Sequence, residues 1–151
     1  MSIQISNSNL NSIFKNIQKY SPYPSNVKII AVTKGFGHQA ILSAISQKIK
    51  CIGENKVQEF FKKQNKITQT NFESHLIGHL QSNKIKKAIE LFDVIQTVDS
   101  IKLAEKLNKQ LLTLDRKKQI YVQINIGNDA NKFGFSPVSI LKKIEKIEKM
   151  K

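Results

Sequence analysis

The chain has 151 residues, 40% of them hydrophobic, which predicts one globular domain over 1–151 and excludes a disordered chain. Its formal net charge is +14, but every basic residue except Arg116 is a lysine, whereas specific nucleic-acid surfaces favour arginine and interleaved aromatic residues. We therefore expect no specific nucleic-acid partner, and the absence of a long apolar run or a signal peptide predicts no membrane partner.

Apolar residues at helical spacing alternate with short apolar runs along the chain. In chain order, these patterns predict a helix at 7–20, a strand at 27–34, a helix at 38–49, a strand at 51–53, a helix at 56–65, a strand at 75–80, a helix at 84–91, a strand at 94–98, a helix from Asp99 or Ser100 to 113, a strand at 120–126 and a helix from Ser136-Pro137. The run VKIIAVTK at 27–34 is typical of a parallel strand buried on both faces.

An opening helix followed by five strand–helix units predicts an α/β protein with a parallel sheet. Repeats of about 20 to 25 residues suit a (β/α)8 barrel of the TIM type, of which five units would form about five-eighths. A doubly wound, flavodoxin-like open sheet is the alternative, because five units can complete one.

Polar side chains follow all five predicted strands. They are Lys34, Glu54-Asn55, His79 with Gln81, Ser82 and Asn83, Asp99-Ser100, and Asn125 with the loop that contains Lys132. In parallel α/β folds such groups converge at one edge of the sheet, which makes a ligand site there the default hypothesis. Helix capping is the alternative reading; we favour it for Asp99 and Ser100 and leave it open for Asn55.

The histidines and the single cysteine carry less information. His38 is expected at the surface, and His75 is expected to pack or to face solvent. His79 follows a strand beside Gly78, which allows another group to approach closely, but from position alone we favour a satisfied structural histidine. Because the histidines lie far apart and Cys51 is alone, we predict no metal site and no internal disulfide, and the cysteine content favours the cytoplasm.

Five ordered blocks resemble the signatures of the YggS-like pyridoxal phosphate homeostasis proteins, which have the fold of the alanine racemase N-terminal domain. They are AVTK at 31–34, GEN at 53–55, HLIGHLQSNK at 75–84, VDS at 98–100 and INIGNDANKFGF at 124–135. The third block is highly specific, and the others occur in the right order and spacing.

The resemblance implies a pyridoxal 5′-phosphate (PLP) site. Lys34 matches the family lysine that holds the cofactor as an internal aldimine, and we expect it to be desolvated among apolar strand residues. Asn55 matches the asparagine near the cofactor ring, and His79 matches the histidine at the mouth of the third strand. Asn125 and Lys132 match recurring positions after the fifth strand. Family members influence cellular PLP balance without established turnover, so PLP-dependent apoenzymes are the candidate protein partners.

The sequence departs from the family pattern at Thr33, where serine is common, and at Ser74, where an aromatic residue is usual. Family members also continue through three more strands, which hold the phosphate. We therefore expect an open sheet edge that favours self-association. Two alternatives stay open: a racemase-like enzyme that removes an α-proton from an amino acid, and a truncated product with impaired cofactor binding.

Overall fold

The computed structural model describes residues 4–68 and 71–150 and is built around a five-stranded parallel sheet. The strands are β1 (Ile30–Val32), β2 (Cys51–Glu54), β3 (Glu73–Leu76), β4 (Val94–Val98) and β5 (Gln119–Val122). Their spatial order, β1-β2-β3-β4-β5, follows the sequence. A doubly wound sheet would reverse its order at a switch point, so this alternative is wrong and the predicted partial barrel is confirmed.

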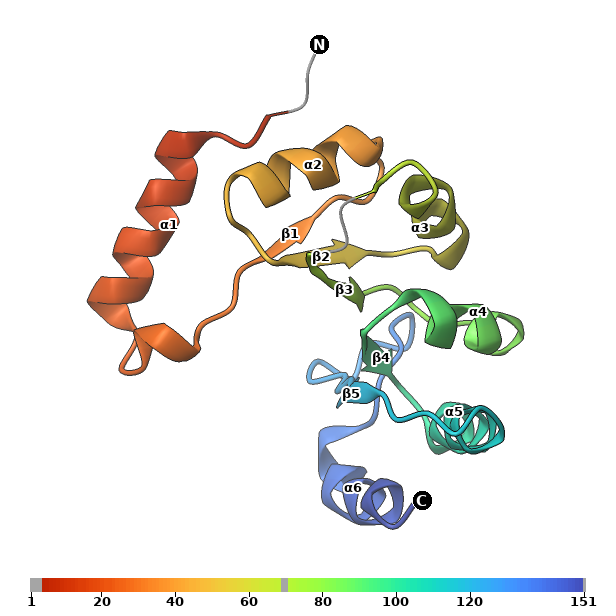
Figure 1. Ribbon diagram of the computed structural model, residues 1–151. Helices are drawn as coiled ribbons and strands as arrows, with labels where there is room; N and C mark the ends of the chain where they lie inside the picture. Colours follow the sequence, from red (N-terminus) through yellow and green to blue (C-terminus); the bar gives the residue numbers. More distant parts are fainter. Residues whose placement is uncertain (1–3, 69–70, 151) are drawn as a thin grey trace.

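Helices line the outer side of the arc that the strands form (Figure 1). The helical segments are α1 (Asn7–Tyr20), η1 (Pro24–Asn26), α2 (His38–Ser46), α3 (Val57–Gln64), η2 (Ser82–Lys84), α4 (Ile85–Leu91), α5 (Ile101–Thr113), η3 (Pro137–Ser139) and α6 (Ile140–Glu148). Helices α2 to α5 cover one face of the sheet, and α1 flanks its β1 end. No helix in the described ranges is both long and apolar enough to cross a bilayer.

The hydrophobic core lies between the sheet and these helices. Alternate residues of the central strands point into it, including Ile52, Leu76 and Ile95, which are fully buried. From the helix side, the rings of Phe60 and Phe92 stack with centroids 4.7 Å apart. One face of each strand therefore builds the core, which leaves the other face free to carry polar groups.

In the part of the chain that the structure describes, that other face is exposed at its β1 and β5 ends, although its centre at Cys51 and His75 is buried; this corrects the expectation for the first strand. Only Ile30–Val32 of the predicted 27–34 forms β1, and Val32 is 48% exposed rather than buried. The reason is that among the described residues β1 pairs with β2 alone, so one edge of the strand has no ladder partner. The fifth strand shows the same openness, since Tyr121 at the centre of β5 is 49% exposed.

Several predicted boundaries are wrong by a few residues. Strand β3 begins at Glu73 instead of His75 and ends at Leu76, because its first residues pair with β2 from Cys51 onward. Strand β5 ends at Val122, and the chain continues only through an isolated bridge between Ile124 and Phe135. The predicted spans 7–20 and 94–98 are confirmed without change.

The second helix ends earlier than its apolar pattern suggested. Lys48 adopts a left-handed φ of 60°, and the Ile49 N–H donates to the Ala44 carbonyl at 3.1 Å. This is the geometry with which helices commonly stop. Ile49 thus joins the core from outside the helix, which explains why it matched the helical stripe.

Candidate functional site

All five predicted strand-end positions lie at the carboxyl edge of the sheet. Lys34, Asn55, His79, Asp99 and Asn125 follow β1 to β5 within three residues of each strand's end. Because the strands are parallel, these residues share one edge, as the sequence predicted. Their side chains nevertheless have different surroundings.

His79 is held by two contacts from other strand ends. Its Nδ1 lies 2.8 Å from Asp99 Oδ2, and its ring stacks on Phe133 with centroids 3.8 Å apart and an interplanar angle of 14°. The favoured reading of Asp99 as a helix cap is therefore wrong, because Asp99 pairs with His79. The same reading is confirmed for Ser100, whose side chain accepts from the Leu103 N–H and caps α5.

Asn55 and His79 line one cavity of about 360 Å³, together with Gly78. Lysines 56 and 84 line it as well, so its walls suit an anionic ligand. A Cβ on Gly78 would lie 2.7 Å from the Asn55 Cα, so only glycine permits this approach of the two loops. The close approach that we expected at Gly78 is thus made by the Asn55 backbone.

Asn125 serves its own loop. Its Nδ2 donates to the carbonyl oxygens of Asp129 at 2.8 Å and Lys132 at 3.2 Å, and its Oδ1 accepts from the Asp129 N–H. Its own N–H donates to Phe135 O at 2.9 Å. These bonds close the loop that carries Phe133 onto His79, so Asn125 shapes the site through its loop. Lys132 is exposed and lies near Asp129.

Lys34 follows the last paired residue of β1 and is exposed. The expected desolvation of its side chain is therefore wrong for the described chain, because the face of the sheet beside it is uncovered. Its backbone neighbours are held firmly. Lys63 Nζ donates to the Thr33 carbonyl at 2.9 Å, and the Gly35 N–H donates to Glu59 Oε1 at 2.7 Å.

A buried ionic network beneath Lys34 was missed by sequence reasoning. Glu54 Oε1 accepts from Thr33 Oγ1 at 2.5 Å and from Lys63 Nζ at 2.6 Å, and both charged side chains are almost fully buried. Lys63 Nζ also lies 2.8 Å from Glu59 Oε1. The hydroxyl of Thr33 thus supplies the donor that the more common serine would supply.

Two further observations describe this network. The hydrogen bond from Lys63 lowers the pKa of the Glu59 carboxyl, against the opposing effect of its partial burial. Glu54 Oε2 is buried and has no hydrogen-bond partner among the described residues. A signal was present in the sequence: Lys63 lies three residues after Phe60, on the stripe of α3 that faces the core.

Two residues that seemed isolated in the sequence, His75 and Cys51, have a polar neighbour in common in the structure. His75 is buried, and its ring nitrogen Nε2 lies 2.9 Å from Glu73 Oε1. Cys51 Sγ lies 3.6 Å from the same oxygen. The neighbours of His75 thus come from β2 and from two residues earlier in β3, which are contacts that spacing in the sequence does not show.

Comparison with known proteins places this geometry in a family. The family model for the alanine racemase N-terminal domain matches residues 6–151. The chain belongs to this family. Among its curated members, the chain is 42% identical over 133 residues to the pyridoxal phosphate homeostasis protein of Buchnera aphidicola and 38% identical over 128 residues to that of Haemophilus influenzae. These matches cover 85% and 83% of the chain.

Solved structures of this alanine racemase N-terminal domain family agree. PipY of Synechococcus elongatus, without PLP, superposes with a TM-score of 0.83 at 34% identity, covering 95% of this chain and 65% of PipY. PipY with PLP bound gives a TM-score of 0.73 at 29% identity, covering 89% of this chain and 65% of PipY. The chain spans little more than half the length of the curated relatives, 58% of the Buchnera protein and 54% of the Haemophilus protein.

Proposed function

We propose that this chain binds PLP at the carboxyl edge of its sheet and acts, like its named relatives, in PLP homeostasis. The observation that carries the proposal is the placement of Lys34. It lies two residues after the end of β1, and hydrogen bonds from Lys63 and to Glu59 hold the backbone on both sides of it. A lysine with a fixed backbone and an accessible amine can reach an aldehyde at this edge of the sheet.

The groups around the edge fit such a ligand. Asn55 and His79 line a cavity that also contains two lysines, which suits a phosphorylated ring. In its covalent form, Lys34 Nζ attacks the aldehyde carbon of PLP, a C=N bond forms, and the aldehyde oxygen leaves as water. Asn55 and His79 orient the ring, while Asn125 holds the loop that carries Phe133.

The affinity is expected to be modest. Barrels generally bind phosphate through the loops after strands seven and eight, and the described sheet has five strands. The described residues therefore supply the amine of Lys34 and, in a neighbouring cavity that Lys34 does not line, the groups proposed to contact the ring, whereas the phosphate would rely on Lys56 and Lys84. These two exposed or half-exposed cations lose much of their attraction to screening by salt.

Borohydride trapping tests the covalent anchor. PLP is added to the purified chain, the imine is reduced with borohydride, and the labelled peptides are mapped by mass spectrometry. We expect one dominant label on Lys34 and its loss in Lys34→Arg, which keeps the charge. Lys86→Arg, in an exposed position on α4, is the matched control and should label like the unmodified chain.

Nonspecific labelling is the outcome that would contradict the anchor. The chain contains 25 lysine and arginine residues, of which only one is arginine, so random imine formation would spread the label over many peptides. A pattern unchanged by Lys34→Arg would show that the amine has no special role.

A further inference from the structure

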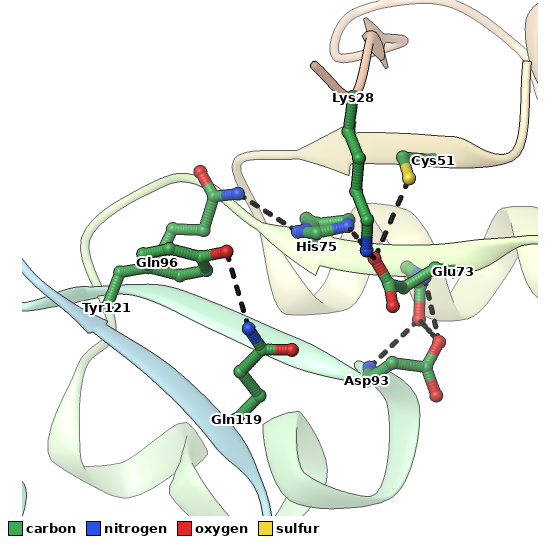
Figure 2. Close-up of polar contacts among 9 residues, drawn as sticks. Lys28, Cys51, Glu73, His75, Asp93, Gln96, Gln119 and Tyr121 are labelled. Atoms are coloured by element: carbon green, nitrogen blue, oxygen red, sulfur yellow. Dashed lines mark hydrogen bonds and ion pairs between the residues drawn. The ribbon is translucent and has the colours of Figure 1, made fainter. Parts of the chain in front are cut away.

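A second cluster of reactive side chains lies at the opposite end of the strands from Lys34. It consists of Cys51 at the start of β2 and Glu73 and His75 in β3. Cys51 pairs in register with Glu73, and Gly53 with His75, so the three side chains project from the same face of the sheet. Figure 2 shows them pointing toward one another.

The geometry of this cluster is that of a metal-binding group. One ligand atom from each residue, the thiol sulfur, a carboxylate oxygen and a ring nitrogen, lies within 4.8 Å of the others. Glu73 Oε1 is the shared centre, 3.6 Å from Cys51 Sγ and 2.9 Å from His75 Nε2. Both Cys51 and His75 are buried, so their positions are set by the sheet.

We propose that Cys51, Glu73 and His75 bind a divalent transition metal ion, Zn²⁺ by preference. A thiolate with an imidazole and a carboxylate is a ligand set that zinc accepts in tetrahedral geometry, with water in the fourth position. On binding, the Cys51 thiol gives up its proton to solvent and His75 keeps its remaining proton on Nδ1. The ion then ties the first residue of β2 to β3.

A partner that orients the imidazole is already in place. The Gln96 side-chain amide lies 2.9 Å from His75 Nδ1, on the side of the ring that faces away from Glu73 (Figure 2). An amide can donate to a bare ring nitrogen or, after rotation, accept from a protonated one. Gln96 can therefore hold the tautomer that leaves Nε2 free for a metal.

Lys28 competes with the ion. Its Nζ lies 3.3 Å from Glu73 Oε1, but its side chain is 67% exposed and can move into solvent. An exposed ion pair of this kind contributes little free energy to stability. Breaking it should therefore cost less free energy than the bonds to the metal ion release. A cavity of about 630 Å³, lined by Lys28, Cys51 and Glu73, gives the ion access from solvent.

Titration with Co²⁺ alone, in the absence of PLP, tests the site. Because the chain has a single cysteine, a thiolate-to-cobalt charge-transfer band can come only from Cys51. We expect the band to saturate at one equivalent per chain, to vanish on addition of Zn²⁺, and to be absent in Cys51→Ser. His38→Gln, on a half-exposed histidine of α2, is the matched control and should keep the band.

Two more variants separate binding from folding. Gln96→Leu should weaken Co²⁺ binding about 10- to 100-fold, as expected for loss of a partner that orients a ligand. Lys28→Met should strengthen it, which mere damage to the fold would not do. Circular dichroism checks that each variant is folded. No thiolate band in the reduced chain, or equal binding by Cys51→Ser, would overturn the proposal.

Discussion

Loss of the Lys63 side chain should destabilise the fold strongly. Lys63 is 7% exposed and donates to Glu54, whose side chain is fully buried. Removal of one partner from a buried ion pair leaves an uncompensated charge and costs about 3–5 kcal/mol. We therefore expect Lys63→Met to lower the free energy of unfolding by about that amount, measured by urea denaturation.

The matched control is Lys146→Met on α6. Lys146 makes an ion pair of similar length with Glu105, at 2.7 Å, but the two side chains are 57% and 52% exposed. Such pairs contribute about 0–1 kcal/mol. Equal effects of the two substitutions would contradict the importance that we assign to the network beneath Lys34.

Glu59 predicts a pH dependence of stability. The hydrogen bond from Lys63 lowers the pKa of its carboxyl from the ordinary 4.5. A carboxyl with a lowered pKa in the folded state contributes stability that is complete above pH 4.5 and is lost as the pH falls through the folded value. Urea denaturation between pH 7 and pH 3.5 should show this decline, and Glu59→Gln should make it shallower; an unchanged slope would contradict the assignment.

Among the helices, α5 should depend measurably on its first residue. The Ser100 side chain accepts from the Leu103 N–H at 3.2 Å, whereas Ser136 precedes η3 without any such bond. Loss of a capping side chain costs about 1 kcal/mol. Ser100→Ala should therefore lower the melting temperature, and Ser136→Ala, the matched control, should leave it almost unchanged. A larger loss of melting temperature in Ser136→Ala than in Ser100→Ala, measured by calorimetry, would contradict the capping role of Ser100.

The identity and order of the elements could be predicted from the sequence because they depend on local periodicity. Every predicted helix and strand has a counterpart in the structure. The ends of β1, β3 and β5 could not be predicted, since they depend on the neighbouring strand: Val27 and Ile29 belong to the apolar run before β1 but have no ladder partner in β2. The pairing partners lie tens of residues away, beyond any local pattern.

The candidate site was predictable only in part, for the same reason. Lys34, Asn55 and His79 were found from their positions after strands. Contacts across the sheet were not visible, such as those of Lys63 with Glu54 and of Asp99 with His79. Asn125 was predicted to contact the cofactor, whereas its side-chain amide donates both of its hydrogen bonds to carbonyl oxygens of its own loop.

Within residues 4–68 and 71–150, the sheet has an unpaired edge at both sides. Strands β1 and β5 each pair with one neighbour, so each presents unpaired N–H and C=O groups. We expect the purified chain to self-associate in a concentration-dependent way, measured by sedimentation velocity over a wide range of concentrations. A monodisperse monomer throughout would contradict this expectation.

The uncovered face itself should contribute less to association than the strand edges. It carries polar side chains, among them the buried His75 and also Gln96, Gln119 and Tyr121, which Figure 2 shows on the same face. Gln119 donates to the Tyr121 hydroxyl at 3.3 Å, and Gln96 contacts His75. A polar face of this kind stays compatible with water, so pairing through backbone edges is the expected mode of contact.

The stack of Phe133 on His79 has a spectroscopic consequence. An aromatic ring 3.8 Å from the imidazole, nearly parallel to it, shields the imidazole protons through its ring current. The chain has three histidines, so these resonances are few and readily separated. The chemical shift of the His79 ring protons therefore reports whether Phe133, and with it the loop closed by Asn125, lies over the carboxyl edge of the sheet. The position of that loop can thus be followed by NMR without an added label.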